Sequence, residues 1–155
     1  MSQLKFRNAE RKDTSVILTL IKSLAKYERL EDKVVATVES LEVSLFDQKY
    51  ADVLLLEIES KIIGFALYFF TFSTFEGKPT LYLEDLYIHD EHRGLGYGKE
   101  TLKKLSDIAK SKGCARFEWS CLDWNQSAID FYQSLGAKPQ KGWTIYRLEK
   151  DDFLD

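Results

Sequence analysis

The chain has 155 residues and a formal net charge of −3, with 45% apolar and 30% charged residues. These values suit one compact soluble domain over residues 1–155, and they exclude a disordered or collagen-like chain. The acidic balance gives the molecule no electrostatic footprint for nucleic acid or an anionic membrane surface. We therefore expect neither nucleic acid nor a membrane as a partner.

Cysteine usage and the chain start bear on the compartment. Cys114 and Cys121 are seven residues apart, a spacing that fits neither a CxxC redox pair nor a zinc site. The first residues lack the apolar run of a signal peptide, and the longest apolar stretch, 62–72, is too short to span a bilayer. The simplest expectation is a cytoplasmic protein with reduced thiols.

The first half of the chain predicts a strand, two helices and a hairpin. The expected elements are a strand at 4–7, a helix capped by Asp13 or Thr14 with apolar residues at 17, 20, 21 and 24, a shorter helix from Thr37, and two strands at 53–59 and 62–71. Ser60-Lys61 suits a tight turn between those two strands. The hairpin predicts antiparallel pairing in this part of the sheet.

The second half predicts alternating strands and helices. The expected elements are a strand at 80–89, a helix at 98–112 ended by Gly113, a strand at 115–122, a helix at 127–135 closed by Gly136, and a final strand at 143–149. The β-loop-α-β unit at 80–122 normally joins parallel strands by a right-handed crossover. The fold class is therefore α/β (α+β) with a mixed sheet.

A glycine-rich loop is the main functional signal of the sequence. Between the strand at 80–89 and the following helix lies Arg93-Gly94-Leu95-Gly96-Tyr97-Gly98. Glycines let a ligand approach the backbone, and the N–H groups at a helix start favour an anion. Residues 93–116 carry seven basic and two acidic side chains. The loop therefore predicts a site for a small polyanion.

Two common phosphate motifs differ from this loop. A P-loop requires GxxxxGK[ST], whereas Lys99 is followed here by Glu100. A dinucleotide fingerprint requires GxGxxG, whereas the loop is GxGxG. Glu118 does stand about 20 residues on, where a ribose-binding acid would be, so a nicotinamide-dependent dehydrogenase stays open at this point. The single clear βαβ unit favours a different ligand.

The pattern Arg93–Gly96–Gly98 resembles the pyrophosphate loop of the GNAT superfamily of N-acetyltransferases. Further similar segments occur in the same order at 24–28, 82–87, 122–125 and 131–137. Together they resemble the diamine acetyltransferase subfamily of spermidine/spermine and thialysine Nε-acetyltransferases. The resemblance implies the GNAT fold, which has a mixed, mostly antiparallel central sheet, a parallel βαβ cofactor-binding unit and flanking helices. It also implies acetyl-CoA as the acetyl donor and a homodimer.

Acetyl transfer to an amine requires the neutral amine, and a lysine-like amine has a pKa of about 10.4. A carboxylate can accept its proton. Glu84 and Asp85 stand in an apolar strand, where an unpaired acid is rarely structural. The strand period places them on opposite faces unless a bulge intervenes. The resemblance implies Glu84 as the base, Asp85 near the cationic substrate, and Tyr132 as the acid that protonates the CoA thiolate.

The resemblance assigns further positions. Those expected at the cofactor are Leu86, Tyr87 and Ile88 along the pantetheine arm, Arg93, Gly94, Leu95, Gly96, Tyr97, Gly98 and Lys99 around the pyrophosphate, and Asn125, Ala128 and Tyr132. Those that the resemblance places at the amine are Tyr27, Glu28, Glu84 and Asp85, and Trp143 is a further candidate, either as an aromatic wall for the alkyl chain of the substrate or as a core residue. His89 and His92 form HxxH without a third ligand, so no metal is expected.

Two positions bear on the choice of amine. Ser73 and Lys141 stand where polyamine enzymes of this family carry an aspartate and a glutamate. The loss of one acid and the gain of a base favour a small lysine-like or diamine substrate, of thialysine type, over a long polycation. The alternatives are a polyamine or protein-lysine acetyltransferase and, from another class, a non-catalytic acyl-CoA-binding module in which Glu84 is only structural.

Overall fold

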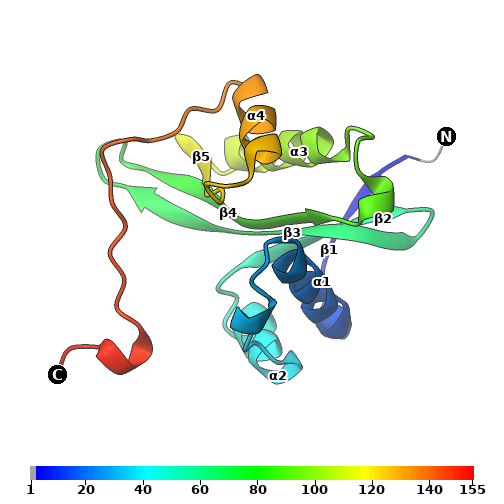
Figure 1. The fold of residues 1–155 in the computed structure, drawn as a ribbon, viewed down its shortest axis with the longest axis horizontal. Helices are drawn as coiled ribbons and strands as arrows, with labels where there is room; N and C mark the ends of the chain where they lie inside the picture. The colour runs from blue at the N-terminus through cyan, green and yellow to red at the C-terminus, as the bar shows by residue number, and fades with distance from the viewer. Residues whose placement is uncertain (1–2) are drawn as a thin grey trace. The chain divides into compact units, whose positions relative to one another are not determined.

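The computed structural model describes residues 3–155, which divide into two compact units, 3–120 and 121–155. The first unit is built on a sheet with the strand order β1-β2-β3-β4-β5 (Figure 1). Its strands are β1 (Lys5–Asn8), β2 (Asp52–Ile58), β3 (Lys61–Ser73), β4 (Lys78–Ile88) and β5 (Arg116–Trp119). All neighbours pair antiparallel except β4 and β5, which are parallel. The mixed sheet predicted from the sequence is confirmed.

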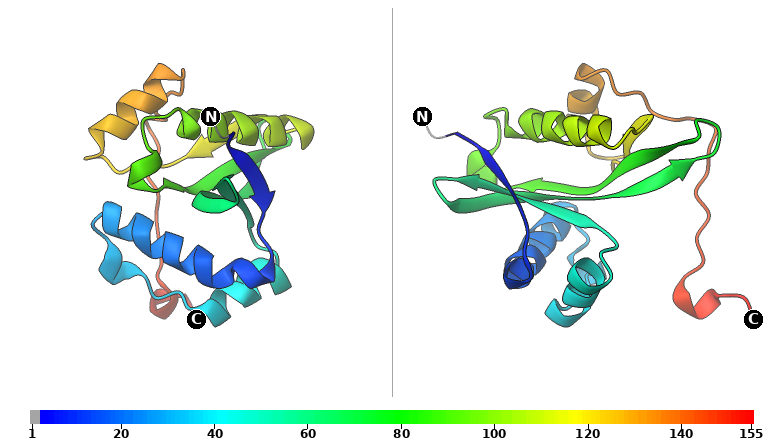
Figure 2. Two further views of the ribbon diagram at one scale, coloured as in Figure 1. Left: turned by 90° about the vertical axis from the view of Figure 1, so that its right-hand side faces the viewer. Right: turned by 180° about the vertical axis from the view of Figure 1, so that it is seen from behind.

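Helices cover both faces of this sheet. The α-helices of the first unit are α1 (Thr14–Tyr27), α2 (Val38–Leu41) and α3 (Tyr97–Ser111), and α2 continues into a π-helix, η3 (Glu42–Asp47). Short 3-10 turns stand at η1 (Arg11–Asp13), η2 (Glu31–Lys33) and η4 (Asp90–His92). In Figure 2, α1 and α2 lie on one face and α3 on the other. The sheet is therefore the middle of three layers.

The core forms on both faces because β2 and β3 are nearly continuous apolar runs. On the α1 face, Ile17 and Leu20 pack with Leu55 and Phe65. The next residue of β2, Leu56, belongs to a separate cluster with Leu4 and Ile63. Side chains alternate across a strand, so consecutive leucines enter different layers. The helical spacing predicted for residues 17–24 is confirmed by the burial of the side chains of α1.

Two local predictions hold in part. Thr37 caps α2 as expected, since its hydroxyl accepts a hydrogen bond from the Ser40 N–H at 3.0 Å. The hairpin turn was placed one residue late. Glu59 and Ser60 form it, with φ of 50° and 66°, and Lys61 already belongs to β3. Two successive positive φ angles give the turn the twist that a two-residue hairpin needs.

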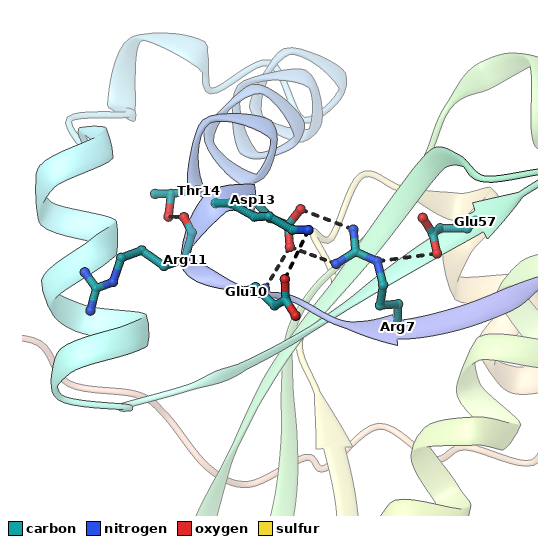
Figure 3. Close-up of polar contacts among 7 residues, drawn as sticks. Arg7, Glu10, Arg11, Asp13, Thr14 and Glu57 are labelled. Carbon is teal, nitrogen blue, oxygen red and sulfur yellow. Dashed lines mark hydrogen bonds and ion pairs between the residues drawn. The ribbon is translucent and has the colours of Figure 1, made fainter.

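Asp13 occupies the predicted N-cap position of α1, but the predicted capping hydrogen bond of its side chain is absent. The Asp13 carboxylate accepts hydrogen bonds from Arg7 Nη1 at 2.9 Å and from the Glu10 N–H at 2.7 Å (Figure 3). Arg7 also lies 3.5 Å from Glu57 through its Nε. Asp13 therefore ties β1 to α1 through a partly buried ion pair.

Replacing Asp13 with asparagine is expected to lower the free energy of unfolding by about 2–3 kcal/mol at pH 7, because charged hydrogen bonds are lost from a buried site. The Arg7 hydrogen bond lowers the pKa of Asp13 below its ordinary value. The stabilisation is therefore complete above about pH 4 and is lost as the pH falls through the lower folded pKa. Urea unfolding at pH 7 and pH 3 measures this, and an equal difference at both would contradict it.

The second unit contains α4 (Gln126–Ser134) and a 3-10 turn, η5 (Lys150–Asp152). Helix α4 was predicted to within a residue, but the strand predicted at 143–149 is absent, and that stretch has no regular hydrogen-bonded structure. A strand forms only against a partner, and a lone apolar segment within its own unit has none. The single domain expected over 1–155 stays a prediction.

Gly64 allows the end of β4 to lie close to β3, because it has no side chain. A Cβ built on Gly64 would lie 2.2 Å from the Tyr87 carbonyl oxygen, and this backbone atom cannot rotate away. We expect Gly64→Ala to lower the free energy of unfolding by about 2–3 kcal/mol, measured by urea titration. Gly77→Ala is the control, since it meets open space and its positive φ of 65° costs about 1 kcal/mol. A loss no larger than that of the control would contradict this.

Candidate active site

The two acidic residues of β4 lie at a β-bulge. The register pairs Leu67 with Asp85 but Tyr68 with Leu83, so Glu84 is an extra residue with no partner position on β3. A bulge interrupts the alternation of side chains along a strand and re-aims them. The strand period predicts that the two acids face opposite sides of the sheet unless a bulge intervenes, and the structure has that bulge. Glu84 is exposed, and Asp85 is half-buried.

A third carboxylate joins this pair from α1. Glu28 is the residue that directly follows α1. Burial, then the charges of Glu84 and Glu28, raise the pKa of Asp85 to about 7. Burial, then the charge of Glu84, also raise the pKa of Glu28. The end of α1 and the bulge in β4 thus bring together three of the residues predicted at the amine, here named the carboxylate cluster.

The carboxylate cluster can bind a cation and accept a proton. Several negative charges in one half-buried place favour an ammonium group. A carboxyl with a pKa near 7 exchanges its proton readily at neutral pH. The sequence predicts only a binding role for Asp85, because burial and the approach of Glu28 come from the fold. The structure adds Asp85 to Glu84 as a group able to take a proton.

The edge of β4 next to the cluster is open in the sheet. Strand β5 pairs with β4 only from Thr80 to Leu83, where Leu83 meets Trp119. Beyond that point, the sheet of the described residues pairs β4 with β3 alone. Leu86 and Ile88 lie on this stretch. Backbone N–H and C=O groups on such an edge suit a ligand with amide groups, as the predicted pantetheine contact requires.

The glycine loop leads directly into α3. Gly94 and Gly96 have φ of 75° and 87°, and Gly96 is the N-cap residue. The helix begins at Tyr97, so the N–H groups of its first turn lack carbonyl acceptors within the helix. Leu95 and Lys99 are exposed beside them. This arrangement fits the diphosphate of a CoA thioester, which needs several N–H donors and a positive field.

Arg93 makes contacts within the first unit that the sequence does not predict. Its Nε donates to the Ile88 carbonyl at 2.7 Å, and its Nη1 lies 2.7 Å from Asp90 Oδ1. The guanidinium carbon is 4.7 Å from the ring centroid of Tyr27 and 5.2 Å from that of Tyr87. Arg93 therefore contacts the end of α1 and the end of β4. Its contact with a pyrophosphate stays a prediction.

The remaining predicted residues belong to the second unit. The Asn125 side chain caps α4 by accepting a hydrogen bond from the Ala128 N–H at 3.3 Å. The ring of Tyr132 lies 5.6 Å from that of Phe131. Trp143 is largely exposed. The cofactor role of Asn125 and Ala128, the acid role of Tyr132 and the substrate role of Trp143 stay predictions.

Metal and membrane features were searched over residues 3–155. No three His, Cys, Asp or Glu side chains in this range gather closely enough to hold a metal ion. The ring of His89 instead packs edge-on against Tyr87, with centroids 5.5 Å apart. No described helix has the length and apolar character needed to cross a membrane.

Known proteins resemble this chain in sequence and in fold. Residues 19–137 match the model of the acetyltransferase (GNAT) family. A thialysine N-epsilon-acetyltransferase of Sus scrofa is 37% identical, over 96% of this chain and 94% of its own. A spermidine/spermine N(1)-acetyltransferase-like protein of Homo sapiens is 36% identical, over 100% of this chain and 24% of its own.

Among solved structures, an integron cassette protein of V. cholerae superposes with a TM-score of 0.79 at 24% identity, over 96% of this chain and 94% of its own. That likeness concerns the fold, and the family match and the curated relatives bear on the chemistry. The glycine loop directly precedes α3, in the position that the sequence resemblance implied. The chain belongs to the GNAT family of acetyltransferases and is an enzyme of the acyltransferase class.

Proposed function

We propose that this enzyme transfers the acetyl group of acetyl-CoA to the primary amine of a small lysine-like or diamine substrate, with a thialysine-type amine preferred. The amine attacks the thioester carbonyl directly while both substrates are bound, so no residue of the chain is acetylated. The observation that carries the proposal is the carboxylate cluster of Glu28, Glu84 and Asp85 beside the open edge of β4.

The chain's own residues divide the work. The carboxylate cluster binds the ammonium form of the amine, and Glu84 accepts its proton so that the neutral amine can react. The backbone of Leu86–Ile88 and the first turn of α3 hold the donor by its amide and phosphate groups. Tyr132 returns a proton to the departing thiolate. Each of these roles can be tested separately by substitution.

The preference for a small amine is supported at Ser73. Its side chain is buried, and its hydroxyl accepts a hydrogen bond from the Glu76 N–H at 3.2 Å in the β3–β4 turn. Ser73 thus supports the hairpin and adds no negative charge that a long polycation could use. The thialysine enzyme of Sus scrofa, similar over nearly all of both chains, supports the same choice.

The substrate proposal is tested by initial rates with acetyl-CoA against thialysine, lysine, putrescine and spermidine, followed as CoA released. We expect the highest kcat/KM with thialysine, whose sulfur lowers the amine pKa and with it the cost of deprotonation. A preference for spermidine would overturn the substrate assignment. It would instead favour the polyamine alternative, which the Homo sapiens relative supports.

We also propose a homodimer, as the family resemblance implied. Large apolar side chains of the second unit are exposed in the single chain, with Ile145 at 82% and Tyr146 at 92%. Partner strands would satisfy both the apolar surface and the backbone of this stretch. Light scattering on the purified chain tests this, and a monomer at assay concentration would contradict it.

A further inference from the structure

Arg93 makes four contacts that join separate parts of the first unit. Its side chain hydrogen-bonds the Ile88 carbonyl and pairs with Asp90. Its guanidinium also lies over the rings of Tyr27 and Tyr87. Tyr87 is buried in the core between the sheet and α1. One side chain thus connects α1, β4 and the loop that precedes α3.

The residues that Arg93 contacts belong to both halves of the candidate active site. Tyr27 is the last residue of α1 and directly precedes Glu28 of the carboxylate cluster. Ile88 ends the open stretch of β4 that fits the acyl donor. The charge of Arg93 is already matched by Asp90, and two of its nitrogens already have oxygen partners.

We propose that Arg93 is a positioning residue that fixes the end of α1 against the end of β4. It thereby holds the binding positions of the amine and of the acyl donor at the distance and orientation that the reaction needs. The inference rests on the proposed function, because it concerns the geometry of that reaction. It differs from the sequence expectation, in which Arg93 acts at the pyrophosphate of the donor.

The contacts require arginine and not only a positive charge. A planar guanidinium can donate hydrogen bonds in its plane while its face lies on an aromatic ring. A lysine ammonium is a compact point charge and cannot reproduce this geometry. For a phosphate contact, by contrast, a lysine can still bind as a point charge. Arg93→Lys therefore separates the two roles.

The choice of acetyl donor provides a second way to distinguish a positioning role of Arg93 from a pyrophosphate-binding role. S-acetylpantetheine carries the thioester and the amide arm but lacks the pyrophosphate. We expect Arg93→Lys and Arg93→Gln to lower kcat/KM by about 10- to 100-fold with acetyl-CoA and by the same factor with S-acetylpantetheine, with a raised KM for thialysine, since small misplacements of reacting groups cost this much. Lys99→Gln, in the first turn of α3, is the matched control and should affect acetyl-CoA only.

Tyr27 tests the same link without altering Arg93. Tyr27→Phe retains the ring under the guanidinium, whereas Tyr27→Leu removes it. We expect Tyr27→Leu to raise the KM for S-acetylpantetheine as well as for the amine, and Tyr27→Phe to leave the KM for S-acetylpantetheine unchanged whatever its effect on the amine. Combined with Arg93→Gln it should cost less than the two single losses added together. A Tyr27 that only touches the amine would leave the donor KM unchanged, which would overturn the proposal.

Two further results would overturn it. One is a near-normal Arg93→Lys enzyme, and the other is a loss in Arg93→Gln that disappears with S-acetylpantetheine. Thermal unfolding of each variant identifies any that do not fold, and the Tyr27 pair then decides. A wild-type chain that transfers acetyl to no amine from either donor would refute the proposed function itself, and the positioning role with it. A failed positioning role in an active enzyme would leave the proposed function standing.

Discussion

Replacing Glu84 with glutamine is expected to lower kcat/KM for acetyl transfer by about 10²–10³-fold, because the amide cannot accept the proton of the ammonium substrate. The amide has nearly the same size, and Glu84 is exposed at the bulge, so the free energy of unfolding should change by less than about 0.5 kcal/mol. Initial rates with acetyl-CoA and thialysine, together with urea unfolding, measure both quantities.

The control for this variant is the neighbouring acid. Asp85→Asn removes a carboxyl from the same cluster without touching Glu84. We expect it to raise the KM for the amine more than it lowers kcat. An active Glu84→Gln enzyme beside an inactive Asp85→Asn enzyme would transfer the role of base to Asp85. If both variants were as active as the wild type, neither Glu84 nor Asp85 would be the proton acceptor.

Asp85→Asn is also expected to make the fold more stable at neutral pH. Burial, then Glu84 and Glu28, raise the pKa of Asp85 to about 7, so the folded chain holds this proton more tightly than the unfolded chain does. The stability contributed by the protonated carboxyl is complete below about pH 4 and is lost as the pH rises toward 7. Asparagine does not ionise and avoids that loss.

The expected gain is about 2–4 kcal/mol at pH 8, since each pKa unit corresponds to about 1.4 kcal/mol. It should shrink as the pH falls and be small near pH 4. Urea unfolding of the wild type and Asp85→Asn at pH 4, 6 and 8 measures it. Glu59→Gln, at the exposed β2–β3 turn, is the control for removal of a negative charge. A gain that does not vary with pH would contradict the assigned cause.

Asp85→Asn is expected to weaken binding of the amine and to stabilise the fold, because the site is built at a cost in stability. A half-buried carboxyl between two others destabilises the fold and at the same time favours a cationic substrate. Binding of the amine places a positive charge beside Asp85, which lowers its pKa and favours the ionised form. We therefore regard the raised pKa of Asp85 as a property of the amine site before the substrate enters.

Much of the sheet and its helices follows from local sequence. The apolar spacing of 17–24 identified α1, and the Gly94–Gly96 turn located the start of α3 to within a residue. Local patterns also gave the hairpin of β2 and β3, although its turn was one residue off. The strand expected at 143–149 could not be settled this way, because an alternating apolar segment becomes a strand only where a partner strand is available.

The candidate site was predicted by residue identity and not by geometry. Glu28, Glu84 and Asp85 were named in advance, but the bulge depends on how β3 pairs with β4, which no single-strand pattern contains. The requirement for glycine at position 64 is not predictable from local sequence for the same reason, since it comes from the close approach of the Tyr87 carbonyl, 23 residues later. The contacts of Arg93 with Tyr27 depend on the packing of α1 against the sheet.

The most direct test of acetyl transfer at the carboxylate cluster is a reaction of the purified chain with acetyl-CoA and thialysine, in which both products are quantified. We predict N-acetylated thialysine and CoA in equal amounts from the wild type, and a loss of both in Glu84→Gln. CoA released without an acetylated amine, or donor binding with no transfer to any amine of the panel, would contradict it.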